Sequence, residues 1–219
     1  MKQYHKIQTI FKRDMTNGAR LILDEYSEPE FEYLKDNPWV FTEKVDGTNI
    51  RIMWDGTSVT FGGKTDDAQM PVFLLYKLQE LFEGTAKKLL FRETFTSDDK
   101  GATQVCLYGE GYGAKIQKGG GNYIANGVDF VLFDIKIGNW WLSRESVEEI
   151  AETFGIKTVP VLGEGTITDA IAMVRKGFNS QWGDFIAEGL VLRPKTELFS
   201  RKGDRIITKI KYRDFQNLT

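Results

Sequence analysis

The sequence predicts an α+β protein whose core is a mainly antiparallel sheet, and three observations support this. Short runs of apolar or alternating residues recur along the chain, the 22 glycines fall mostly between these runs, and helical patterns are few. The chain has 219 residues, of which 41% are hydrophobic, enough for one domain with its own core. We therefore expect a single domain over residues 1–219.

Strand patterns occur in seven segments, some alternating in polarity with a period of two and others apolar nearly throughout. They are residues 39–44, 49–54, 58–63, 104–109, 129–137, 188–193 and 205–212. An apolar stripe predicts a helix over residues 72–82, and a second helix is expected to follow through Phe95. Capping boxes predict two more helices: Ser146 with Glu149, ending near Gly155, and Thr166 with Asp169, ending at Gly177.

Composition argues against several classes of protein. The single cysteine, Cys106, lies in an apolar run and is interpreted as a buried structural thiol, which fits a reducing compartment. With one histidine, His5, a Ser-His-Asp triad or a multi-histidine zinc site would be hard to assemble. No segment approaches the roughly 20 apolar residues needed to cross a bilayer, and no signal peptide is evident. We expect a cytoplasmic protein without a membrane partner, which fits the interior of a virus-infected host cell.

Charge is unevenly distributed although the net charge is only −2. Residues 24–36 hold six acidic side chains against Lys35, whereas residues 193–213 hold eight basic side chains against Glu197 and Asp204. A basic segment on an acidic protein is where the phosphates of a polynucleotide would bind. A solvated surface hairpin is the other interpretation of the same residues.

Two glycine-rich segments do not fit the phosphate-binding loops that they suggest. Residues 62–65 end like a P-loop, but Ser58 stands where the first glycine should be, and no helix is expected before Pro71. A dinucleotide-type loop is suggested by residues 108–113, YGEGYG, yet the following residues 114–123, AKIQKGGGNY, have no helical periodicity. Neither a P-loop nor a Rossmann site is predicted.

A set of charged residues remains after these exclusions. Lys44-Val45-Asp46-Gly47 lies between two predicted strands, and alternation places the Lys44 amine and the Asp46 carboxylate on one side of the chain. This element alone could be a turn with a surface lysine. Four further elements follow it in order: Glu110 within YGEGYG, the strand FVLFDIKI, Glu188-Gly-Leu-Val-Leu, and Lys209-Ile-Lys211, whose lysines share a strand face. The five elements together indicate a functional constellation.

From about Phe41 to Phe215 these elements resemble the covalent nucleotidyltransferase superfamily of ATP-dependent ligases and capping enzymes, and most closely the phage-type RNA ligases. The resemblance implies an antiparallel-sheet nucleotidyltransferase fold, the ATP-grasp-like adenylation domain of ligases. Because only Tyr212 to Thr219 follow Lys211, no C-terminal OB or accessory domain is expected.

The resemblance also implies roles for individual residues. Lys44 would be the nucleophile, and Lys209 and Lys211 would act on the phosphates during catalysis. Glu110 would bind the ribose hydroxyls and Glu188 would lie near the metal, which makes these two carboxylates the candidate metal ligands. The other expected ATP-binding residues are Glu43 and Val45 beside the nucleophile, Asp46, Gly47, Asn49, Lys64 and Phe130.

Three of these residues have expected positions around the nucleotide. Phe130 would stack on the adenine, although Phe133 faces the other side of the strand by alternation and a core role is the other interpretation of Phe130. Asn49 would lie near the sugar or the phosphates. Lys64 stands where related RNA ligases often have an arginine, so it keeps the charge and loses the planar bidentate fork.

The implied chemistry explains these residue types. A lysine amine in water has a pKa of about 10.4, so cationic neighbours such as Lys209, Lys211 and Mg²⁺ (or Mn²⁺) would favour the reactive, unprotonated form. AMP carried on Lys44 would pass to an RNA 5′-phosphate, which a 3′-hydroxyl then attacks. We predict an ATP-dependent RNA ligase of RNA repair that needs ATP and a divalent metal. A DNA ligase, a capping guanylyltransferase and a non-catalytic nucleic-acid-binding module are the alternatives.

Overall fold

Two large sheets, each with its own hydrophobic core, and two small hairpins form the computed structural model, which describes residues 3–97, 101–102 and 104–216. The central unit consists of Asp46–Val159 together with the N-terminal residues through Tyr4. The split unit consists of His5–Val45 together with Pro160–Thr219. The single domain expected over residues 1–219 stays a prediction.

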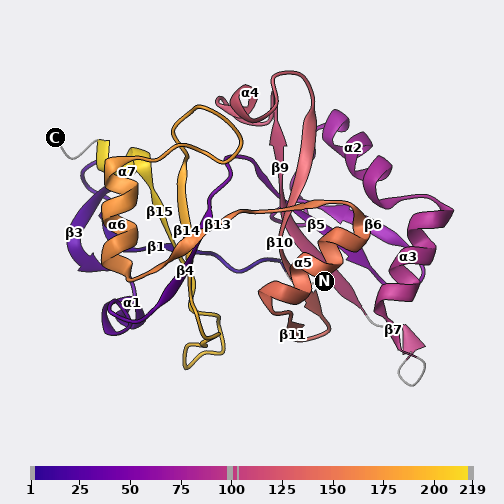
Figure 1. Ribbon diagram of the computed structural model, residues 1–219, viewed down its shortest axis with the longest axis horizontal. Coiled ribbons are helices and arrows are strands. Elements are labelled where there is room, and N and C mark those ends of the chain that lie inside the picture. The colour runs from indigo at the N-terminus through magenta and orange to yellow at the C-terminus, as the bar shows by residue number, and fades with distance from the viewer. Residues whose placement is uncertain (1–2, 98–100, 103, 217–219) are drawn as a thin grey trace. The chain divides into compact units, whose positions relative to one another are not determined.

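The central unit is built on a sheet with the strand order β11-β10-β9-β5-β6, in which neighbouring strands run antiparallel (Figure 1). A short strand, β12, pairs in parallel with β10, and β7 and β8 form a separate hairpin. The elements are β5 (Thr48–Trp54), β6 (Val59–Gly62), α2 (Val72–Phe82), α3 (Thr85–Phe95), β7 (Thr96–Ser97), β8 (Gly101–Ala102), β9 (Val105–Gly113), α4 (Gly120–Tyr123), β10 (Val128–Ile137), β11 (Trp140–Trp141), α5 (Arg144–Phe154) and β12 (Lys157–Thr158).

Alternation along β5 assigns the two faces of this sheet. Ile50, Ile52 and Trp54 lie in the core beneath α2, α3 and α5, and the side chains between them, Asn49 and Arg51, therefore belong to the opposite face. The helix predicted over residues 72–82 is confirmed, as are its successor and the four strands of this region, because apolar patterns specified each of them. The strand predicted over residues 104–109 is longer than expected, since β9 continues to Gly113.

The predicted start of α5 was wrong. The cap is Ser143, whose Oγ accepts a hydrogen bond from the backbone N–H of Ser146 at 3.3 Å. Ser146 lies within the first turn because Arg144 already begins the helix. The predicted end is confirmed, since Gly155 adopts the left-handed conformation (φ +67°) that favours glycine.

The split unit contains a five-stranded sheet with the order β1-β15-β14-β4-β13. Its neighbouring strands are antiparallel except for β1 and β15, which run parallel. The elements are β1 (Gln8–Thr9), β2 (Phe11–Asp14), β3 (Arg20–Tyr26), α1 (Pro29–Tyr33), β4 (Trp39–Glu43), β13 (Val161–Gly165), α6 (Ile167–Lys176), β14 (Gly189–Pro194), β15 (Thr208–Lys211) and α7 (Tyr212–Gln216).

The core of the split unit lies between this sheet and α6, which packs on β14 and β15 (Figure 1). The capping box of Thr166 and Asp169 is present and α6 stops before Gly177, as predicted. The last strand is shorter than the expected 205–212. Arg205 pairs instead with Phe199 in the β14–β15 connection, and Tyr212 begins α7.

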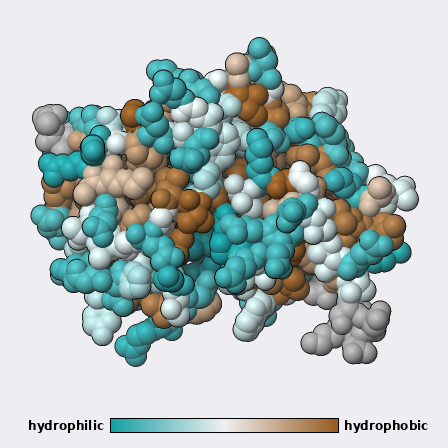
Figure 2. All heavy atoms as spheres, viewed as in Figure 1, coloured by the Kyte–Doolittle hydropathy of each residue, from teal (hydrophilic) through white to brown (hydrophobic). Residues whose placement is uncertain are grey.

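Surface and thiol properties agree with a folded α+β protein. Hydrophobic residues lie in small groups between hydrophilic ones on the face shown in Figure 2. None of the helices in the described part of the chain is long and apolar enough to cross a membrane. Cys106 is buried, and burial raises the pKa of its thiol to about 11, which confirms the interpretation of a structural cysteine.

Candidate functional site

The split unit brings together the ends of three strands at the predicted nucleophile. Lys44 follows β4 directly, and its backbone N–H donates to the carbonyl of Gly189 at 2.9 Å. The strand register pairs Glu43 with Leu190, and Gly189 with Lys211. The end of β4, the start of β14 and the end of β15 therefore lie side by side at one end of the sheet.

Glu188 forms hydrogen bonds with two lysines at this end of the sheet. Its Oε2 accepts a hydrogen bond from Lys44 Nζ at 2.6 Å, and its Oε1 accepts one from Lys211 Nζ, also at 2.6 Å. The side chains of Lys44, Glu188 and Lys211 are 19%, 11% and 15% exposed. Charge-assisted hydrogen bonds of this length are strong, and partial burial reduces screening by water. The structure thus places three predicted site residues in one ionic cluster.

Lys209 extends this cluster along β15. It pairs with Val191 in the register and is half-buried, whereas its neighbours Thr208 and Ile210 are buried. The predicted shared face of Lys209 and Lys211 is therefore confirmed. Val45, on the other side of the nucleophile, is 4% exposed and belongs to the buried part of the split unit.

Glu43 points away from the cluster into the protein. Its carboxylate is 1% exposed and accepts hydrogen bonds from Ser180 Oγ at 2.5 Å and from the backbone N–H of Gln181 at 2.8 Å. Burial raises the pKa of Glu43, and the two hydrogen bonds oppose that rise. Its own backbone N–H donates to the carbonyl of Pro160 at 3.0 Å. Glu43 therefore anchors the loop 179–186, which leads to Glu188.

In the central unit, two side chains that the sequence did not single out hold the other half of the Lys-Val-Asp-Gly element. The backbone N–H of Asp46 donates to the Tyr123 hydroxyl at 3.1 Å, and Gln117 Nε2 donates to the carbonyl of Gly47 at 3.0 Å. A Cβ on Gly47 would lie 2.3 Å from the carbonyl oxygen of Gly111, so glycine is required there. Tyr123 and Gln117 lie within the segment AKIQKGGGNY. The sequence showed only that this segment lacks helical periodicity, and nothing in it predicted these two contacts.

Asn49 and Glu110 lie directly opposite each other on β5 and β9, on the face away from the helices. Side chains at such a position have Cβ atoms roughly 4.5–5.5 Å apart. The Oδ1 atom of Asn49 is buried and has no hydrogen-bond partner among the described residues. Because a buried acceptor left unpaired costs about 1–3 kcal/mol, this oxygen indicates a place for a donor from a ligand.

The two phenylalanines of β10 lie on opposite faces, as the alternation predicted. Phe130 is 1% exposed and packs edge-on against Phe82 in the core, with ring centroids 5.5 Å apart. Phe133 lies where the register of β10 shifts, and its ring contacts Tyr4 with centroids 5.1 Å apart. Tyr4 in turn contacts Tyr108, which shares the face of Glu110. The stacking role of Phe130 stays a prediction, and its place in the core counts against it.

Lys64 lies in an exposed turn after β6, and the side chain of Arg51 forms hydrogen bonds with this turn. The Arg51 side chain is 1% exposed; its Nε donates to the carbonyl of Gly63 at 2.8 Å, and its terminal nitrogen pairs with Asp66 at 2.7 Å. This contact lowers the pKa of the Asp66 carboxyl. Arg51 thus fixes the chain on both sides of Lys64, a role hidden in the sequence because Arg51 alternates with core residues.

The two candidate metal ligands belong to different units, Glu188 to the split unit and Glu110 to the central unit. Both oxygens of Glu188 are engaged by lysines. Within the described residues, no three or more histidine, cysteine, aspartate or glutamate side chains converge as a metal site. The metal assignment of Glu188 and Glu110 stays a prediction.

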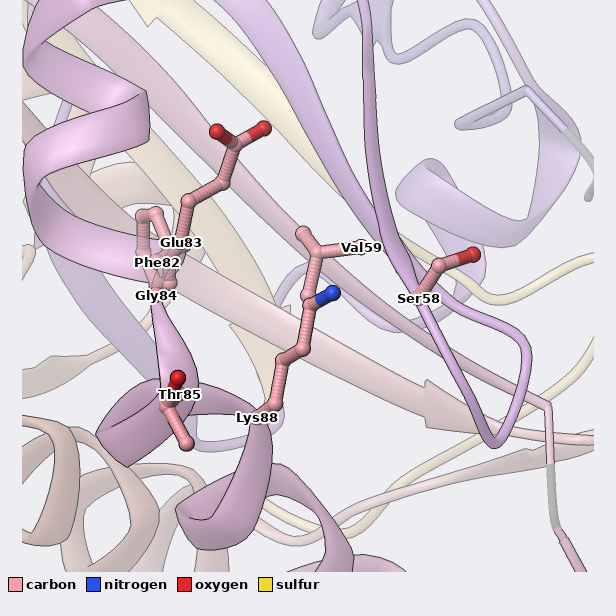
Figure 3. Close-up of a pocket in the computed structure, with 7 residues that line it drawn as sticks. All are labelled: Ser58, Val59, Phe82, Glu83, Gly84, Thr85 and Lys88. Atoms are coloured by element: carbon pink, nitrogen blue, oxygen red, sulfur yellow. The ribbon is translucent and has the colours of Figure 1, made fainter.

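A cavity of about 320 Å³ lies in the central unit away from the predicted site residues (Figure 3). Glu83, in the connection between α2 and α3, and Lys88, in α3, both line it. Its lining residues are Ser58, Val59, Phe82, Glu83, Gly84, Thr85 and Lys88. None of the residues expected to bind the nucleotide is among them.

Comparison with known proteins gives one family and one fold. The model of the RNA ligase family matches residues 37–211. The structure is similar to that of Naegleria gruberi RNA ligase with PPi, at 18% identity and a TM-score of 0.62, over 96% of this chain and 58% of that one. A mutant of the same protein with ATP and Mn gives the same values, and an apo mutant gives 17%, 0.63, 100% and 60%. No curated protein matches the sequence.

At these identities the likeness shows the fold, a mixed α+β architecture with antiparallel sheets. The predicted fold class is confirmed to that extent. The chain spans 58–60% of the length of these solved structures. The absence of an accessory domain stays a prediction.

The buried carboxylate of Glu43 generates a stability prediction. Replacing it in Glu43→Ala should lower the free energy of unfolding by roughly 1–3 kcal/mol, because Ser180 and Gln181 lose their acceptor. In Glu43→Gln the amide oxygen can still accept from the Gln181 N–H, and the amide NH2 can donate to the Ser180 hydroxyl, so the loss should be smaller. Urea unfolding at neutral pH measures both variants, and equal losses would contradict the anchoring role.

The same variants predict a pH dependence. Because the pKa of Glu43 is raised above its ordinary value of 4.5, the folded state binds a proton more tightly than the unfolded state. The wild type should therefore gain stability relative to Glu43→Gln as pH falls through the folded pKa, with no further gain below the unfolded pKa. Parallel stability curves for the two proteins would argue against a raised pKa.

Proposed function

The chain belongs to the RNA ligase family, and from this premise we propose that it joins RNA ends with ATP through AMP carried on Lys44. The observation that supports this most directly is the cluster of Lys44, Glu188 and Lys211, in which one carboxylate bridges two partly buried amines. An enzyme that moves a nucleotide onto a lysine needs such an amine at a fixed place beside a second cation.

In the proposed first step, Lys44 Nζ attacks the α-phosphorus of ATP. A nitrogen–phosphorus bond forms, the bond to pyrophosphate breaks, and the proton lost by the amine passes to water. Lys211, held at the same carboxylate as Lys44, and Lys209 on the same strand face would offset the charge that develops on the phosphate oxygens. Solved forms of the similar Naegleria gruberi protein are described with PPi and with ATP and Mn, which supports these reactants.

A single carboxylate such as that of Glu188 would be enough to bind a divalent cation, because a full set of protein ligands is not required. Mg²⁺ commonly binds one or two carboxylates and completes its shell with water and substrate phosphates. Such a cation would supply charge neutralisation at the phosphates. A Glu188 turned towards a cation would release the Lys44 amine from its hydrogen bond to the carboxylate. Glu110 remains a second candidate ligand.

The face of the central sheet that lies away from the helices is the proposed place for the nucleoside. The buried Oδ1 of Asn49 can accept a hydrogen bond, which a ribose hydroxyl can donate and an ionised phosphate cannot. Glu110, directly opposite, offers a carboxylate to the same sugar. Phe133 shares this face whereas Phe130 does not, so we propose Phe133 as the aromatic ring that stacks on the base.

In the later steps an oxygen of the RNA 5′-phosphate attacks the phosphorus of the lysyl-AMP, and the bond to Lys44 breaks. The 3′-hydroxyl of the other RNA end then attacks the adenylated 5′-phosphate, and AMP leaves. Asp46, Gly47 and Lys64 would help to orient the nucleotide during these steps. The RNA ends, the nucleotide and the divalent metal are parts of the proposal that the family membership supports.

A labelling experiment tests the first step. Incubation with ATP labelled at the α-phosphate and Mg²⁺ should leave label on the wild type after denaturing electrophoresis, and Lys44→Ala should carry none. Lys176→Ala removes an exposed lysine at the end of α6 and serves as the matched control, expected to label normally. Label on Lys44→Ala equal to the wild type would refute the role of Lys44.

The two phenylalanines of β10 give a second test. Phe133→Leu should raise the KM for ATP in the labelling reaction by about five-fold to a hundred-fold, since base stacking contributes roughly 1–3 kcal/mol. Phe130→Leu should instead lower the free energy of unfolding by about 1 kcal/mol, as a core substitution does, with little change in KM. The reverse pattern would restore Phe130 as the stacking residue.

Substrate preference is the third test. Preadenylated nicked duplexes made of RNA, of DNA or of both should be sealed fastest when the strand ending in the 3′-hydroxyl is RNA. Discrimination would depend on the 2′-hydroxyl or the A-form shape beside the nick. Rates at two salt concentrations separate phosphate contacts from base contacts, because phosphate contacts weaken with salt. Faster sealing of the all-DNA nick would favour a DNA ligase instead.

A further inference from the structure

We propose that the connection between β14 and β15, residues 195–207, is a contact site for single-stranded RNA. In this site Phe199 stacks on a base, while Arg201 and Lys202 bind the neighbouring phosphates. The inference rests on the proposed ligase function and adds to it, since it identifies where the polynucleotide is held at a distance from the reacting end.

The connection is a hydrogen-bonded hairpin. The backbone N–H of Ile206 donates to the carbonyl of Leu198 at 2.9 Å, and that of Ser200 donates to the carbonyl of Asp204 at 2.7 Å. Leu198 and Ile206 both pack against the core of the split unit. Arg205 is buried and forms an ion pair with Glu197. The base of the hairpin is therefore fixed by core packing as well as by hydrogen bonds.

The tip of the hairpin is closed by a tight turn. The hydroxyl oxygen of Ser200 accepts hydrogen bonds from the backbone N–H groups of Lys202 and Asp204, at 3.3 Å each. Gly203 has φ +81°, a conformation that favours glycine. Because the turn is held at both ends, the side chains on it are presented in defined directions.

Phe199 is exposed despite this order. Its residue remains 53% accessible, while its neighbour Leu198 faces the core. Alternation in the hairpin directs the ring outwards. Arg201 and Lys202 are exposed two and three residues further on, with Asp204 as the one acidic residue of the turn. An exposed aromatic ring beside two cations is the combination by which proteins bind unpaired nucleotides, through stacking and phosphate contacts.

The distribution of charges within residues 193–213 favours the tip of the hairpin as the phosphate site. At least three of the basic side chains in residues 193–213 pair with carboxylates: Lys195 with Glu164, Arg205 with Glu197, and Lys211 with Glu188. Arg201 and Lys202 are exposed on the turn itself. A protein partner is less well supported, because hydrophilic residues break up the hydrophobic groups on the face that Figure 2 shows.

The hairpin lies at the far end of β14 from the reacting group. β14 begins at Gly189, whose carbonyl is bonded to Lys44, and runs for six residues to Pro194, where the hairpin starts (Figure 1). At about 3.3 Å per residue this strand is roughly 20 Å long. Stacked nucleotides rise about 3.4 Å each, so about six nucleotides separate the join from the start of the hairpin, and the tip would meet RNA beyond that point. The contact should therefore depend on the length of the RNA.

The test compares RNA of two lengths, about four and about twenty nucleotides, chosen to fall short of and to exceed this reach. Fluorescence anisotropy with labelled single strands should show Phe199→Ala binding the longer RNA about five-fold to a hundred-fold more weakly. Binding of the short RNA and labelling by ATP should not change. Phe199→Trp should retain the affinity of the wild type. The double variant Arg201→Ala/Lys202→Ala should lower the salt dependence by about 1.4 in the log–log slope.

Each outcome separates this proposal from the ligase function. If the wild type takes label from ATP and binds both RNAs but Phe199→Ala binds them equally well, the hairpin site is wrong and the ligase function stands. A loss of the same size for both lengths also overturns the distant contact. A wild type that neither takes label nor binds RNA would refute both proposals. Thermal unfolding of the variants checks that the hairpin substitutions leave the fold intact.

Discussion

The carboxylate of Glu188 is the contact on which the geometry of the predicted active lysine depends. Lys44 and Lys211 come from strands on either side of β14, and they meet because Glu188 precedes the first residue of that central strand. Gly189 makes this approach possible: a Cβ there would lie 2.0 Å from the carbonyl oxygen of Ile210, and its φ of +150° suits glycine. A partly buried carboxylate with two cationic partners is costly to disturb, because removing either partner leaves charge unbalanced. The pairing of β4, β14 and β15 therefore fixes the amine before any substrate binds.

The Lys-Val-Asp-Gly element combines two folding environments in four residues. Val45 belongs to the split unit and Asp46 to the central unit, so the chain changes unit immediately after the lysine. Lys44 is held through β14, whereas the backbone of Asp46 and Gly47 is held by Tyr123 and Gln117 of the central unit. Neither environment follows from the four letters of the motif. Each is set by residues more than 65 positions away in the sequence, whose hydrogen bonds appear when the sheets form.

The sequence predicted those elements of the fold that local patterns specify. Prediction failed for features that depend on contacts between residues distant in the sequence. The helix over residues 72–82 and the capping box of Thr166 follow from local periodicity and side-chain chemistry. The hairpin of β2 and β3 was missed because its strands are rich in charged residues, so no apolar alternation marks them. The buried roles of Glu43 and Arg51 were also missed. Charged residues at alternating positions look solvated until their partners at Ser180 and Gly63 are known.

The basic segment, residues 193–213, is divided between the two ends of a strand pair. In the sequence it is a single run rich in basic residues. In the fold, β14 and β15 separate it: Lys209 and Lys211 lie at the end of the sheet that carries Lys44, whereas Arg201 and Lys202 lie on the turn at the other end. The carboxylates of Glu164, Glu197 and Glu188 neutralise three of the cations between and around these points. Positive charge is thus concentrated at opposite ends of β14 and β15 with their connecting hairpin, which suits a chain of phosphates better than a single anion.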